Sequence, residues 1–134
     1  MSDPHIAAPS AAPLLRVGVL AVAADEARAE RLQEAGAHLI ALGGDGDVPS
    51  VGALVNAVHS DFAETYIVVG DGPRLNLVLP QVKRILGRRV EIVAAADAAA
   101  EERIVRAFDK RLSAAENAAR MRRLGEEAAA ARLS

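Results

Sequence analysis

The sequence predicts an α/β domain built on a small four-stranded parallel sheet, doubly wound by helices, with a long C-terminal helix. Two observations indicate this class. Short apolar runs rich in Val alternate with longer segments of helical periodicity, and only a few residues connect them. Such alternation with short connections produces parallel sheets with right-handed crossovers and helices on both faces.

The first half of the chain contains two strands and two helices. LLRVGVLAV (14–22) is a nearly continuous apolar run, typical of a strand covered on both faces. DEARAERLQEAG (25–36) is predicted to be a helix, because it has acids in its first turn and Gly at its end. HLIALG (38–43) is the second strand, and apolar spacing predicts a helix within VPSVGALVNAVHSD (48–61).

The second half continues the alternation. ETYIVVG (64–70) is the third strand and RVEIVA (89–94) the fourth. Between them, RLNLVLPQVKRILGR has helical periodicity interrupted by Pro80. Because proline is tolerated in the first turn of a helix and disfavoured in its interior, we expect this helix to start between Leu77 and Pro80.

We expect three parts along the chain: a flexible leader (1–13), the α/β domain (14–113) and a C-terminal helical extension (114–134). The leader is rich in Pro and Ala and cannot bury enough apolar surface to fold. The last helix is predicted over about 98–131, with its first half packed on the sheet and its second half projecting.

The predicted strand order is 2-1-3-4, a flavodoxin-like or Rossmann-like arrangement one strand short of the usual five. In such sheets, ligands bind at the carboxyl ends of the strands, where the strand order reverses. This switch point is predicted to lie between the first and third strands.

Composition excludes several classes of function. The 134 residues include no Cys, so disulfides and thiol chemistry are excluded, and the three His share no spacing typical of metal ligands. No apolar run is long enough to span a bilayer, so we expect a cytoplasmic protein without a membrane partner. A net charge of −2 and only three aromatic residues argue against nucleic acid.

Charge is distributed unevenly along the chain. Residues 24–72 carry a balance of −7, whereas residues 73–134 carry +5. Such an asymmetry can orient a partner or a self-association, and it is equally consistent with a solvated surface.

Two glycine turns follow predicted strands, GGDGD (43–47) and GDG (70–72). Gly and Asp are ordinary turn and helix-cap residues, which explains both segments without a ligand. Alternatively, backbone N–H groups at a helix start can bind an anion, and Mg²⁺ would then offset the carboxylates. The candidate ligand-binding residues are Asp25, Gly43, Gly44, Asp45, Gly46, Gly70, Asp71 and Gly72, with Mg²⁺ or a nucleotide as the candidate cofactor.

Two resemblances extend the ligand hypothesis. GGDGDVPSVGALVNAV resembles the phosphate-binding loop of the diacylglycerol kinase and NAD kinase group, which implies nucleotide contacts at 43–46; Asp47 stands where that family has Thr or Ser. Asp25 and Asp71 resemble the acidic positions of response-regulator receiver domains. The paired acid and the Lys of those domains are missing, which implies a degenerate relative.

The segment FDKRLSAAENAARMRRLGEEAAAARLS exceeds what a four-stranded domain needs to cover its sheet. We therefore favour a non-catalytic accessory or scaffold protein that binds a protein partner or itself. The alternative is a regulatory domain for a nucleotide or phosphorylated metabolite, and an enzyme is the least favoured interpretation. The candidate partner-binding residues are Leu112, Arg120, Met121 and Leu124.

Overall fold

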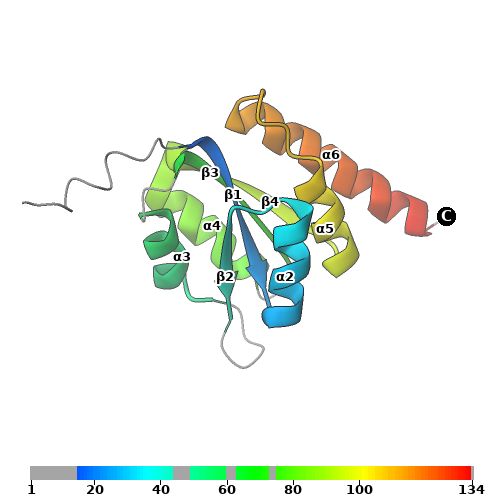
Figure 1. The fold of residues 1–134 in the computed structure, drawn as a ribbon, viewed down its shortest axis with the longest axis horizontal. Coiled ribbons are helices and arrows are strands. Elements are labelled where there is room, and N and C mark those ends of the chain that lie inside the picture. The colour runs from blue at the N-terminus through cyan, green and yellow to red at the C-terminus, as the bar shows by residue number, and fades with distance from the viewer. Residues whose placement is uncertain (1–14, 44–48, 60–62, 73–74, 134) are drawn as a thin grey trace, which may run out of the picture.

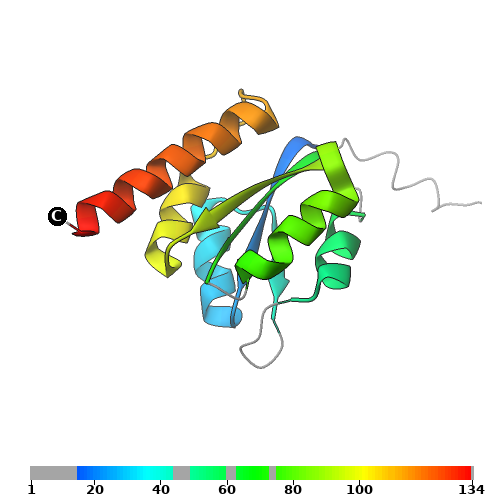
Figure 2. The same cartoon turned by 180° about the vertical axis from the view of Figure 1, so that it is seen from behind.

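A computed structural model describes residues 15–43, 49–59, 63–72 and 75–133 and confirms the predicted fold class. Four parallel strands pair in the order β2-β1-β3-β4, as predicted. Helices α2, α5 and α6 cover one face of the sheet, and α3 and α4 cover the other (Figures 1 and 2). The elements are β1 (Leu15–Ala23), α2 (Glu26–Ala35), β2 (Leu39–Leu42), α3 (Val51–Val58), β3 (Ala63–Asp71), α4 (Leu75–Leu86), a 3-10 turn (Gly87–Arg89), β4 (Val90–Ala95), α5 (Ala98–Arg106) and α6 (Ala114–Leu133).

The central strand β1 is buried on both faces, which explains its continuous apolar sequence. Alternate side chains of a strand point to opposite faces. Val19 and Ala21 therefore face the layer of α2, α5 and α6, whereas Leu20 and Val22 face the layer of α3 and α4. Each face of the sheet has its own apolar core.

His38 fixes the start of β2 against β1. Its Nδ1 accepts a hydrogen bond from the backbone N–H of Val19 at 2.9 Å, and its ring meets Phe108 edge-on at 5.6 Å. Because Nδ1 accepts, the ring is held neutral at that nitrogen, and burial lowers the pKa of His38.

Helix α4 begins at Leu75, so the predicted start between Leu77 and Pro80 was wrong. Leu75 and Leu79 are both buried beneath the sheet, and their burial favours an additional turn before the proline. Pro80 lies inside the helix on its exposed side, where its missing N–H removes one backbone hydrogen bond.

The C-terminal segment forms two helices, which corrects the single helix predicted over 98–131. The buried Asn117 side chain folds the intervening turn, accepting from the N–H of Asp109 and donating to its carbonyl, both at 2.8 Å. Ser113 and Glu116 then form a capping box: each backbone N–H donates to the other side chain, at 3.0 and 3.1 Å. As a result α6 turns back and packs on α5 and β4.

Gly70 sets the distance between β3 and α4. A Cβ atom at this position would lie 1.9 Å from Leu75 Cδ2 and 3.4 Å from Val22 Cβ. We expect Gly70→Ala to lower the free energy of unfolding by about 1–3 kcal/mol, because the added methyl overpacks the core. Chemical denaturation of the purified domain measures this change.

Gly52→Ala provides a matched control, since the nearest atom to an added Cβ there is Ser50 Oγ at 3.9 Å. This exposed helical position should gain roughly 0.5–1 kcal/mol from the higher helix propensity of Ala. Equal stability of Gly70→Ala and the wild type would contradict the described packing of α4.

Candidate functional site

The carboxyl ends of the strands bring together several of the predicted ligand residues. Asp71 ends β3, and Gly72 follows with φ +103°, a conformation that favours glycine. Asp25 caps α2 by accepting from the N–H of Arg28 at 2.9 Å, and the N–H of Gly43 donates to the carbonyl of Ala23 at 3.1 Å. The predicted Gly44, Asp45 and Gly46 lie outside the described residues.

Glu101 of α5 is the residue at this edge that sequence reasoning missed. Its side chain is only 1% exposed, and its Oε2 atom has no hydrogen-bond partner among the residues that the structure describes. The helical spacing contains the signal: Glu101 lies three and four residues before the buried Ile104 and Val105, on the apolar stripe of α5.

Burial raises the pKa of Glu101 to about 8, and the negative charge of Asp71 adds to this shift. Arg28 opposes the shift from 3.5 Å away. At neutral pH Glu101 is therefore mainly protonated and can donate a hydrogen bond.

A charge network joins α2 to α5 beside this carboxyl group. Arg28 donates to the carboxylate of Glu102 and, at 3.0 Å, to the carbonyl of Ala98, where α5 begins. Arg31 donates to the same Glu102 oxygen at 3.1 Å. The hydrogen bond from Arg28 lowers the pKa of Glu102, so this carboxyl stays ionised while its neighbour in the sequence does not.

This arrangement suits a cation or a hydrogen-bond donor better than a phosphate. A phosphate approaching Asp71 would meet a carboxylate, and Glu101 would add a second negative charge whenever it ionises. Among the described residues, no group of three His, Asp or Glu side chains is arranged to hold a metal ion.

The predicted partner-binding residues do not share one surface. Met121 is fully buried in the core beneath α6, whereas Arg120 beside it is exposed. Leu112 and Leu124 are half-buried. The apolar positions of α6 as far as Met121 are therefore used to cover the domain itself.

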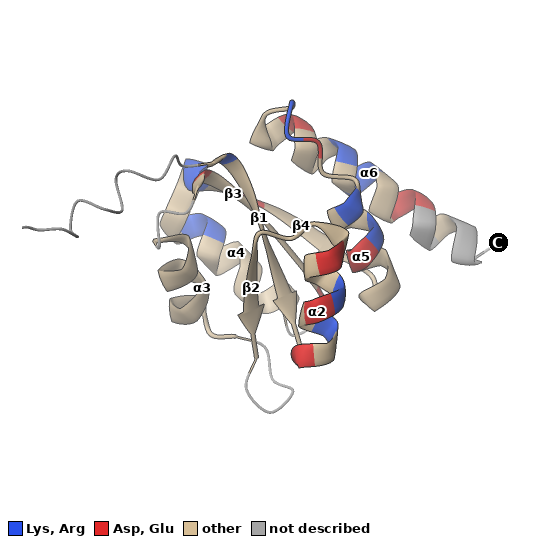
Figure 3. Cartoon of the chain, in the orientation of Figure 1, with Lys and Arg blue, Asp and Glu red and all other residues tan. Residues whose placement is uncertain are grey.

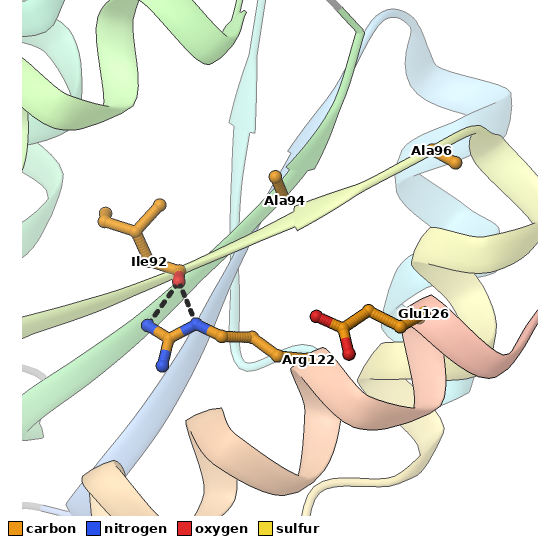
Figure 4. Close-up of a pocket in the computed structure, with 6 residues that line it drawn as sticks. Ile92, Ala94, Ala96, Arg122 and Glu126 are labelled. Carbon is orange, nitrogen blue, oxygen red and sulfur yellow. Dashed lines mark hydrogen bonds between the residues drawn. The ribbon is translucent and has the colours of Figure 1, made fainter. Parts of the chain in front are cut away.

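Helix α6 also protects the free edge of the sheet. Arg122 donates to the carbonyl of Ile92 through Nη2 at 2.7 Å and Nε at 3.1 Å (Figure 4). Lys83 of α4 donates to the carbonyl of Val90 at 2.7 Å. Two cations thus occupy carbonyl groups of β4, which discourages pairing with another strand.

A groove lies between β4 and α6, next to Arg122 (Figure 4). Its volume is about 390 Å³, and Ala94, Ala96, Gly125 and Glu126 contribute to its walls. No helix in the described part of the chain combines the length and apolar character needed to cross a membrane.

The raised pKa of Glu101 predicts a pH-dependent stability. The folded state retains a proton that the unfolded state releases near its ordinary pKa of 4.5, so the free energy of unfolding should fall as pH rises from about 4.5 to about 8. The maximum slope from this group is about 1.4 kcal/mol per pH unit. Glu101→Gln, which is neutral throughout, should remove this contribution in denaturation measured from pH 5 to 9.

Glu102→Gln is the control for that experiment. Since the pKa of Glu102 is lowered, its substitution should leave the loss of stability between pH 5 and 8 in place. The same pH dependence in the wild type and in Glu101→Gln would contradict a buried, protonated Glu101.

Comparison with known proteins identifies the family. The FakA-like C-terminal family model, which describes part of a fatty acid kinase, matches residues 18–133. Among solved structures, the chain is similar to a sigma-54 interaction domain protein from Enterococcus faecalis, with a TM-score of 0.58 and 14% identity over 88% of this chain and 96% of that chain. At that identity the similarity concerns the fold alone. A search of curated proteins finds no match. Because the matched region extends from β1 into α6, the chain belongs to the FakA-like C-terminal family of fatty acid kinase domains.

Proposed function

We propose that this chain is a non-catalytic accessory domain that binds a partner polypeptide of a fatty acid kinase system through α4. The observation that carries the proposal is the exposure of two large apolar side chains on this helix. Leu77 is 71% exposed and Ile85 is 60% exposed. Exposed apolar side chains grouped on one element are typical of interaction sites.

The charges around these residues define the kind of partner. Arg84 and Arg88 are exposed next to Ile85, in the basic half of the chain (Figure 3). A partner segment that presents apolar side chains flanked by carboxylates would complement this surface in both shape and charge. The family description refers to one subunit of a kinase, which supports assembly with other polypeptides.

Polar groups at the ends of the strands favour an accessory role over catalysis. Asp25, Ser50 and Asp97 each cap a helix by accepting a backbone N–H. His38 accepts a backbone N–H within the fold. These side chains stabilise the local structure, so they serve as structural groups in the described part of the chain.

We expect Leu77→Glu combined with Ile85→Glu to weaken binding to the fatty acid kinase polypeptides of the same organism by at least about tenfold, equivalent to roughly 1.4 kcal/mol. Calorimetric titration of purified proteins measures the dissociation constant. Affinity should also fall as salt is added, because Arg84 and Arg88 contribute exposed charges.

Leu42→Glu is the matched control. Leu42 is 50% exposed and lies on β2, at the opposite edge of the sheet. It should leave binding unchanged, and all variants should keep the thermal midpoint of the wild type because the substituted side chains are exposed. Equal losses for both surfaces, or no binding by the wild type, would refute the proposal.

A further inference from the structure

A second surface, away from α4, has the chemistry of an anion site. A groove of about 310 Å³ lies between α2 and α5, on the opposite face of the sheet from α4. Arg31 forms its α2 side, and Ala99, Glu102, Arg103 and Arg106 form its α5 side. Arg103 and Arg106 are three residues apart on one helix, so their side chains lie on neighbouring positions of its surface.

Two of these guanidinium groups have no protein partner in the described part of the chain. Arg103 and Arg106 are both exposed, and neither makes a hydrogen bond or an ion pair with another described residue. The single carboxylate of the groove, that of Glu102, is already bound by Arg28 and Arg31. It therefore holds Arg31 at the wall of the groove and leaves the other two cations available.

The balance of charge indicates the type of ligand. Three guanidinium groups and one carboxylate give the lining a net charge of +2. A phosphate monoester carries about −1.5 to −2 at neutral pH and offers three acceptor oxygens. Arginine donates in a planar fork that matches phosphate oxygens, and Arg31, which is 64% exposed, still has both of its terminal nitrogens free of described partners.

We propose that the groove between α2 and α5 binds a dianionic phosphoryl group through Arg31, Arg103 and Arg106. The ligand is inorganic phosphate or a small phosphate monoester, which share this chemistry. Ala99 is the only apolar side chain of the lining, so the phosphoryl group supplies most of the recognition. This site is independent of the proposed α4 surface, since it lies on the other face of the sheet.

The test follows the Nε–Hε signals of Arg31, Arg103 and Arg106 by ¹H–¹⁵N NMR during titration with inorganic phosphate and, separately, with phenyl phosphate. Sodium chloride keeps the ionic strength constant, which removes general screening effects. We expect saturable shifts of these signals with both probes. Tighter binding of phenyl phosphate would identify an organic monoester as the ligand class, and equal binding would identify free phosphate.

Paired charge-removing variants separate a site from general attraction. Arg103→Gln with Arg106→Gln should weaken phosphate binding at least about tenfold. Arg84→Gln with Arg88→Gln removes the same charge from α4 and should leave it unchanged. The proposal is overturned if both pairs weaken binding equally, if the shifts do not saturate, or if they appear away from the groove.

Discussion

The charge network between α2 and α5 is the interaction on which the functional surfaces of this face depend. Arg28 reaches the start of α5 through Ala98 and Glu102, and thereby joins the helix that follows β1 to the helix that follows β4. The same contact fills the space beside the buried Glu101. Because Glu102 accepts from both arginines of α2, the network also holds Arg31 at the rim of the groove. One set of ion pairs thus separates a carboxyl-lined sheet edge from a guanidinium-lined groove.

The two faces of the sheet therefore differ in chemistry. On one face, α6 turns back at Asn117 and buries Met121, so the long C-terminal helix completes the core. On the other face, α3 and α4 alone cover the sheet, and α4 leaves Leu77 and Ile85 exposed. We propose that a partner covers the second face. The first face keeps its charged groups accessible for small anions.

Most of the fold was predictable because alternation and burial act locally. The Val-rich runs, the caps at Asp25 and Gly36 and the strand order all follow from such signals. The break before α6 was not predicted, although Ser113 and Glu116 form a capping box that sequence spacing contains. The burial of Glu101 needed three dimensions, because a carboxyl on an apolar stripe becomes significant only when Asp71 and Arg28 are known to lie beside it. The placement of 44–46 lies outside the described residues.

Methyl NMR of the domain, with and without the fatty acid kinase polypeptides, tests the proposed docking surface most directly. Leu77 and Ile85 lie on that surface, Leu42 lies at the far edge of the sheet, and Ile104 reports on the core. The account predicts that the methyl signals of Leu77 and Ile85 shift or broaden on binding while those of Leu42 and Ile104 stay in place. Changes confined to Leu42, or an unchanged spectrum, would contradict it.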